Sequence, residues 1–142
     1  MFKKLILFSI TIFCLFSILF YLGWQKDFFR IINCYDKILH FSAGFCVFLT
    51  TYWFIKALEK AKKINKKSFA FKILISFIIL ISISVLWEVF EFTVDKLFDL
   101  PVLQESFNDT VWDLIFDLGG GIIYGLILYF PFKRKYSIIK ML

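Results

Sequence analysis

The residues best suited to chemistry are acids and a single histidine that recur at helical spacing inside apolar segments. They form three pairs: Asp36 and His40, Glu88 and Glu91, and Asp109 and Asp113. Side chains three or four positions apart lie on one face of an α-helix, so each pair predicts a polar stripe. Asp95 and Asp117 continue two of the stripes, and the spacing alone leaves open whether they join the site.

Carboxylates combined with an imidazole are a ligand set for a divalent cation, compatible with Mg²⁺, Mn²⁺ or Zn²⁺. We predict the metal ligands to be Asp36, His40, Glu88 and Asp109. Glu91 and Asp113 are the predicted catalytic residues, either of which would act as general base toward a cation-activated water. This chemistry suits a metal-assisted hydrolase or transferase acting on a lipid or lipid-linked envelope molecule.

Other interpretations of the same residues stay open. The cluster would equally serve a small transporter as a cation- or proton-binding site, or act as a polar core that only fixes helix packing. His40 alone would fit a hydrogen-bonded interfacial residue, and Asp109 would fit a helix cap. Like charges in a low-dielectric pocket need compensation, which protons, a cation, or a base such as Lys37 or Lys96 would supply.

The elements that carry these stripes are predicted to be membrane-spanning helices. Hydrophobic residues make up 61% of the chain and aromatic residues 22%, whereas soluble domains are about 45–50% apolar. Apolar segments predict helices at about residues 4–23, 37–57, 70–95 and 110–132, each long enough to cross about 30 Å of hydrocarbon. The predicted fold is all-α, a polytopic four-helix transmembrane bundle in a single domain of residues 1–142.

The first apolar segment has the basic start of a signal peptide, because Lys3 and Lys4 precede it. Phe20, Tyr21 and Leu22 stand where a cleavage site would need small residues. We therefore expect this segment to be retained as an anchor.

Energetics predict that the polar stripes face one another rather than lipid. A charged side chain at the centre of a bilayer costs about 2.5–3.5 kcal/mol on insertion scales, and convergence inside the bundle removes most of that cost. Gly44 lies one turn from His40 on the same predicted helix, and the Gly119–Gly121 run predicts close helix packing. The spacing of Gly121 and Gly125 would also permit a homodimer.

The distribution of charge predicts the orientation. Of the seventeen Lys and Arg residues, thirteen lie at the two termini and between the second and third helices. Basic residues favour the cytoplasmic side, so both termini are predicted to be cytoplasmic, with the protein in the cell membrane. Ten of the eleven acids lie on the other side, Glu59 being the exception. The basic charge is thus a topology signal toward the lipid bilayer, and no nucleic acid partner is needed to explain it.

Three short blocks resemble known membrane protein families. The segment Asp36-Lys37-Ile38-Leu39-His40-Phe41, followed by Gly44, resembles the opening motif of VanZ-like proteins. Residues 87–92 (WEVFEF) and 108–113 (NDTVWD) look closer to the YjdF-like group. The resemblance covers about residues 35–125 and implies a polytopic bacterial inner-membrane protein of uncharacterised function. The polar residues of its motifs would match Asp36, His40, Glu88, Glu91, Asp109 and Asp113.

Overall fold

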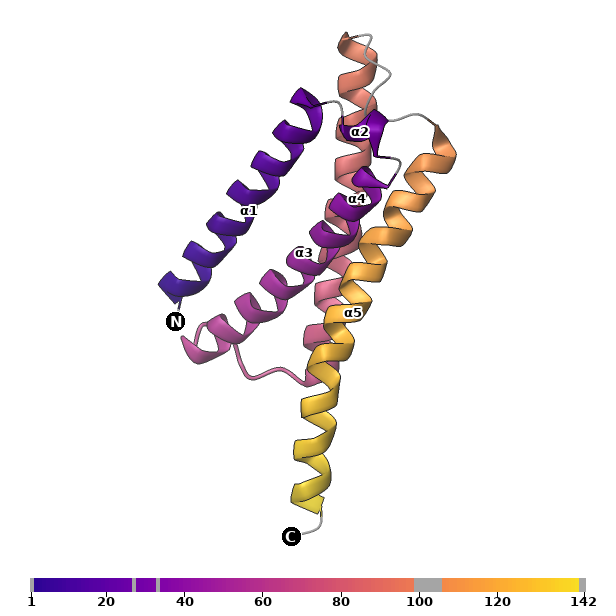
Figure 1. Cartoon of the computed structure of the whole chain (residues 1–142). Helices are drawn as coiled ribbons and strands as arrows, with labels where there is room; N and C mark the ends of the chain where they lie inside the picture. The colour runs from indigo at the N-terminus through magenta and orange to yellow at the C-terminus, as the bar shows by residue number, and fades with distance from the viewer. Residues whose placement is uncertain (1, 27, 33, 99–105, 141–142) are drawn as a thin grey trace.

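The computed structural model of the chain describes residues 2–26, 28–32, 34–98 and 106–140, and the regular elements there are all α-helices. In chain order they are α1 (Phe2–Gln25), α2 (Phe28–Ile31), α3 (Tyr35–Lys60), α4 (Phe69–Phe98) and α5 (Phe107–Lys140) (Figure 1). The all-α prediction is confirmed. Each long helix begins and ends outside the apolar segment that predicted it, and the four-residue α2 was not predicted.

Within the described residues, three helices are long and apolar enough to cross a membrane: α3, α4 and the Phe107–Phe130 part of α5. Large apolar side chains such as Leu86 and Val89 of α4 lie exposed on the outside of the bundle. That arrangement is typical of helices whose solvent is lipid, and the protein is a multi-pass membrane protein. The apolar segment of α1, Ile10–Gly23, is shorter, so its role as a fourth span stays a prediction.

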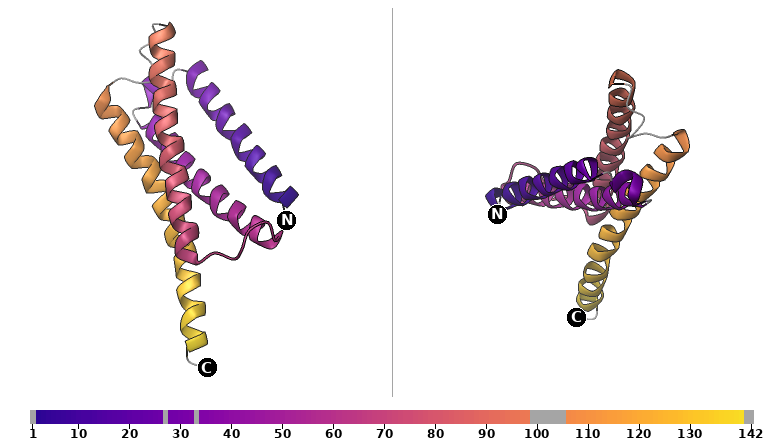
Figure 2. Two further views of the ribbon diagram at one scale, coloured as in Figure 1. Left: turned by 180° about the vertical axis from the view of Figure 1, so that it is seen from behind. Right: turned by 45° about the horizontal axis from the view of Figure 1, so that its top comes forward.

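Helices α3, α4 and α5 form the central bundle, and α1 lies along α3 on the outside (Figures 1 and 2). The Tyr35 hydroxyl donates a 2.6 Å hydrogen bond to the Leu19 carbonyl, which ties the start of α3 to α1. The Phe20 ring also packs edge-on against Trp87 of α4 at 5.8 Å. In Figure 1, α1 begins about level with the α3–α4 connection, and α5 continues well below that level. The direction across the membrane stays a prediction.

Glycines allow α3 and α5 to touch backbone to backbone. A Cβ atom on Gly44 would collide with the Asp117 carbonyl oxygen, and one on Gly120 with the Phe41 carbonyl oxygen. Since any larger residue would push the helices apart, these two glycines set how closely the polar stripes of α3 and α5 approach.

The glycine face that the sequence assigned to a homodimer is used inside the chain. Gly121 is buried, and a Cβ there would meet Leu80, Phe48 and Phe77. Gly125 faces Phe48 as well. A homodimer therefore stays a prediction without this surface to support it.

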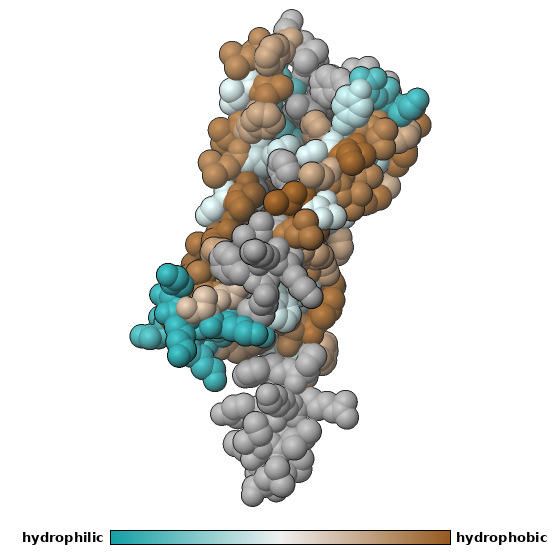
Figure 3. All heavy atoms as spheres, turned by 90° about the vertical axis from the view of Figure 1, so that its left-hand side faces the viewer, coloured by the Kyte–Doolittle hydropathy of each residue, from teal (hydrophilic) through white to brown (hydrophobic). Residues whose placement is uncertain are grey.

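The bundle interior has buried charged groups toward both ends and a hydrophobic core between them. Phe48, Leu80 and Tyr124 form its hydrophobic core. Toward the α3–α4 connection, the buried Lys72 Nζ contacts Glu59 Oε1 at 3.0 Å, and Glu59 also accepts the Lys67 backbone N–H at 2.6 Å. Figure 3 shows one face of the surface, where hydrophilic side chains gather at the lower left and the upper right and hydrophobic side chains cover much of the coloured surface between them.

Candidate metal centre

The polar stripes of three helices meet at the end of the bundle opposite the lysine-rich connection. The start of α3, the second half of α4 and the start of α5 lie there because α4 runs antiparallel to both neighbours (Figure 2). We call the residues they bring together the acid–histidine cluster. Its members are Asp36, Lys37, His40, Glu88, Glu91, Asp109, Asp113 and Asp117. All six predicted site residues are therefore neighbours.

His40 lies at the centre of the cluster and is only 5% exposed. Its Nδ1 is 3.3 Å from Asp117 Oδ2. In the tautomer that carries its hydrogen on Nδ1, the ring donates to Asp117 and leaves the Nε2 lone pair free. This is how a second carboxylate orients a metal-binding histidine.

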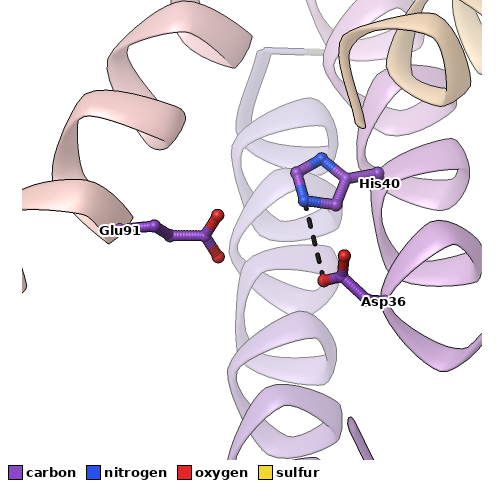
Figure 4. Close-up of side chains that lie close together, drawn as sticks. All are labelled: Asp36, His40 and Glu91. Atoms are coloured by element: carbon purple, nitrogen blue, oxygen red, sulfur yellow. Dashed lines mark ion pairs between the residues drawn. The ribbon is translucent and has the colours of Figure 1, made fainter. Parts of the chain in front are cut away.

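The Nε2 side of the ring faces carboxylates from all three helices. Asp36 Oδ1 and Asp113 Oδ1 are each 3.8 Å from Nε2, and Glu88 Oε1 is 4.0 Å away. Figure 4 shows the carboxylate of Glu91 directed at His40 and Asp36 from α4. Two ligands bound to one ion at about 2.1 Å are at most about 4.2 Å apart, so these separations are within reach of a single cation.

Two triads around His40 supply ligand atoms within 4.8 Å of one another. They are His40 with Glu88 and Asp113, and His40 with Asp36 and Glu91. The first triad is buried at all three positions. A site of one imidazole and two carboxylates suits Mn²⁺ or Zn²⁺, whose preferences include both donor types.

Glu88 provides the observation that points most directly to a ligand. Its side chain is 6% exposed, and neither carboxylate oxygen has a hydrogen-bond partner in the part of the chain that the structure describes. The Thr110 hydroxyl is an electrostatic neighbour from α5 that does not meet hydrogen-bond geometry. A buried carboxylate without a bonded partner is costly, and a cation at Nε2 of His40 would satisfy it.

Lys37 is the internal base of the cluster. Its Nζ lies 2.5 Å from Asp109 Oδ1, 2.6 Å from Asp113 Oδ1 and 3.1 Å from Asp36 Oδ2. Of the two lysines considered from the sequence, this is the one that reaches the acids, since Lys96 lies over the Phe92 ring. The third group of candidate ligands, formed by the same three aspartates, therefore already holds an ammonium group.

The cluster carries more acid than base. It contains six carboxyl groups against Lys37 and His40, so four negative charges would be uncompensated even with both bases protonated. Like charges so close together in a buried site require bound protons or a cation. The acid excess is thus a property of the assembled cluster, which the single stripes do not show.

The structure also decides between the two residues left open by the spacing. Asp117 belongs to the cluster, because it is the partner of His40 Nδ1. Asp36, a predicted ligand, faces the other ring nitrogen, Nε2. The four-residue spacing of Asp109, Asp113 and Asp117 was the signal for this residue. Asp95 is partly exposed and joins none of the three candidate ligand groups.

Comparison with known proteins places the chain among membrane proteins. A family model described as "Predicted membrane protein (DUF2238)" matches residues 1–134. The chain belongs to this family. A Thermotoga maritima protein, described only as an uncharacterized protein, is a relative of this chain and is 35% identical to it over 108 residues.

That alignment covers 76% of this DUF2238 chain and 54% of the relative, so the chain spans about half of the relative's length. No solved structure matches. The family description confirms the predicted polytopic membrane protein. The VanZ-like and YjdF-like names stay resemblances, and neither comparison assigns an activity.

Proposed function

We propose that this DUF2238 protein binds one divalent cation in the acid–histidine cluster and uses it for hydrolysis of, or transfer on, a lipid or lipid-linked molecule. The proposed ligands are His40, Glu88 and Asp113. The single observation that carries the proposal is the buried, unbonded carboxylate of Glu88, with Oε1 4.0 Å from His40 Nε2.

The roles of the remaining acids follow from their positions. Asp117 orients His40 through Nδ1. Glu91 lies outside the proposed ligand triad but close to His40 and Asp36, which suits a general base that takes a proton from the attacking water. When bound, the cation would supply Lewis acidity toward a phosphoryl or carbonyl oxygen. Relative to the sequence prediction, Asp113 becomes a ligand, and the predicted ligands Asp36 and Asp109 become partners of Lys37.

A lipid substrate is supported by the surroundings of the cluster. The site is built from helices that cross the membrane, and large apolar side chains on their outer faces are exposed. A molecule with an acyl chain in the bilayer would therefore bring its polar head to the depth of the cluster. We expect this side to be extracytoplasmic, in keeping with the charge distribution of the chain.

Transport is the second function considered for the cluster. The hydrophobic core next to the cluster favours a hydrolase or transferase over a transporter. Phe48 and Leu80 are 0% and 1% exposed and lie between the cluster and the Glu59–Lys72 pair. A transported cation would have to pass these side chains. Buried apolar side chains on this path disfavour transport and favour a membrane-bound hydrolase or transferase.

Metal analysis of the detergent-purified protein tests the proposal. We expect about one equivalent of Mn²⁺ or Zn²⁺ in the wild type and a loss of at least tenfold in affinity in His40→Ala and Glu88→Gln. Thr93→Val is the matched control, because Thr93 lies exposed on α4 and its hydroxyl donates to the Val89 carbonyl of the same helix. Absence of bound metal in a folded wild type would contradict the proposal.

The reaction needs its own test, because metal binding alone does not separate a catalyst from a carrier. Glu91→Gln should retain the cation, since Glu91 is not a proposed ligand. Bacterial membrane lipids incubated with metal-loaded wild type should show mass changes for hydrolysis or transfer, absent with Glu91→Gln. Equal turnover by both would remove Glu91 from the reaction. If all the acids can be neutralised without loss of folding or cellular phenotype, the cluster serves packing only.

A further inference from the structure

Lys37 holds an oxygen that the proposed cation also needs. Its Nζ is 2.6 Å from Asp113 Oδ1, and this same oxygen is 3.8 Å from His40 Nε2. An ammonium at that distance makes a charge-assisted hydrogen bond, so Asp113 Oδ1 cannot serve both groups at full strength.

The position of Lys37 at the edge of the buried triad gives its ammonium group room to move away from Asp113. Its side chain and those of Asp36 and Asp109 are 18–22% exposed, whereas those of His40, Glu88 and Asp113 are 3–6% exposed. Lys37 therefore lies between the buried ligand triad and the more exposed edge of the cluster. Its flexible stem would let the ammonium leave Asp113 while keeping Asp36 or Asp109 as a partner.

We propose that Lys37 is an internal competitor of the cation, a residue that sets the affinity of the His40–Glu88–Asp113 site by occupying Asp113. This inference rests on the proposed cation site. Binding then exchanges the ammonium for the metal ion at Asp113 Oδ1, and the ammonium moves outward toward Asp36 and Asp109. The displaced ammonium would stand at the exposed edge, where an anionic head group could meet it.

The test compares Mn²⁺ affinity, measured by electron paramagnetic resonance of free Mn²⁺ in detergent at fixed pH and ionic strength. Lys37→Met keeps the length of the stem and removes the charge. Because the charges lie a few ångströms apart in a buried site, its dissociation constant should fall by about tenfold or more. Lys37→Arg keeps the charge and should not bind Mn²⁺ more tightly than the wild type, because a guanidinium also pairs with carboxylates. A residue with only a structural role would give weaker binding in Lys37→Met, never tighter binding.

A second variant covers the case in which Lys37→Met leaves too many acids unpaired to fold. Lys37→Met/Asp109→Asn removes one of those acids and leaves Asp113 in place. It should fold and bind Mn²⁺ more tightly than Asp109→Asn alone. Equal or weaker binding in this comparison would overturn the competitor role.

The outcomes separate this inference from the proposed function. Wild type that binds Mn²⁺ with no gain in Lys37→Met overturns the competitor role only. Binding in Lys37→Met that depends on His40, together with none in the wild type, supports the competitor role and overturns the proposed function. If no folded variant binds, both are overturned.

Discussion

Asp117 shows how a single side chain decides what its neighbour can do. Its Oδ2 lies 3.3 Å from His40 Nδ1, and both side chains are only 5% exposed. The ring is therefore held with Nε2 toward Asp36, Glu88 and Asp113. A histidine that is held through Nδ1 in this way is oriented for ligation through Nε2 before the cation arrives.

Removing the Asp117 carboxylate should weaken metal binding without removing a ligand. Asp117→Ala is expected to raise the dissociation constant for Mn²⁺ or Zn²⁺ by about 10- to 100-fold, because the ring loses its fixed tautomer and orientation. Asp117→Asn keeps an acceptor oxygen and should lose less. The measurement is metal titration in detergent. An Asp117→Ala affinity equal to that of wild type would remove the orienting role.

At the scale of the helices, the contact between α3 and α5 determines whether a cluster exists. Gly44 lies against the Asp117 backbone, one turn from His40 on α3. The close approach at this point brings the His40 and Asp117 side chains within reach of each other. The same spot therefore sets the packing of the bundle and the geometry of the site.

Gly44→Ala should disturb both the packing of the bundle and the geometry of the site. Its Cβ would overlap the Asp117 carbonyl, and overpacking of this kind costs about 1–3 kcal/mol. We expect a lower melting temperature in detergent and a loss of metal affinity. Gly119→Ala is the control, because its Cβ would meet the Phe41 ring at an ordinary 3.6 Å. A stable Gly44→Ala protein with unchanged metal binding would show that the helix contact does not set the site.

At the scale of the whole molecule, charge is separated between the two ends of the bundle. The acid–histidine cluster lies where α3 and α5 begin, and the lysine-rich connection follows the opposite end of α3 (Figure 1). Basic residues favour the cytoplasmic side of a membrane, so the cluster is expected to face outward. This orientation decides which molecules can reach the site.

Cysteine labelling tests the orientation. Cys34 is exposed at the start of α3, at the cluster end, and a variant with Cys14 and Cys46 changed to Ala keeps it as the single thiol. A membrane-impermeant maleimide should label it in intact cells. In a variant whose three native cysteines are all Ala, Lys63→Cys should react only after permeabilisation. The reverse pattern would place the cluster on the cytoplasmic side.

The sequence by itself determined the membrane class, the helical architecture and the faces that carry the acids. These features depend on local composition and on spacing along one helix. An uncharged apolar segment predicts a span, and acids four residues apart share a face in any helix. All six predicted site residues consequently lie in the same cluster.

Only the tertiary structure decided which partner each side chain has. The bond of Asp117 to His40 and the contacts of Lys37 with Asp109 and Asp113 join residues far apart in the chain. The unbonded carboxylate of Glu88 depends on the same packing of three helices. Such contacts depend on the rotation and depth at which helices cross, which close contacts at Gly44 and Gly120 set here. The internal use of the Gly121 face was decided in the same way, because a small residue permits close approach without specifying the neighbour.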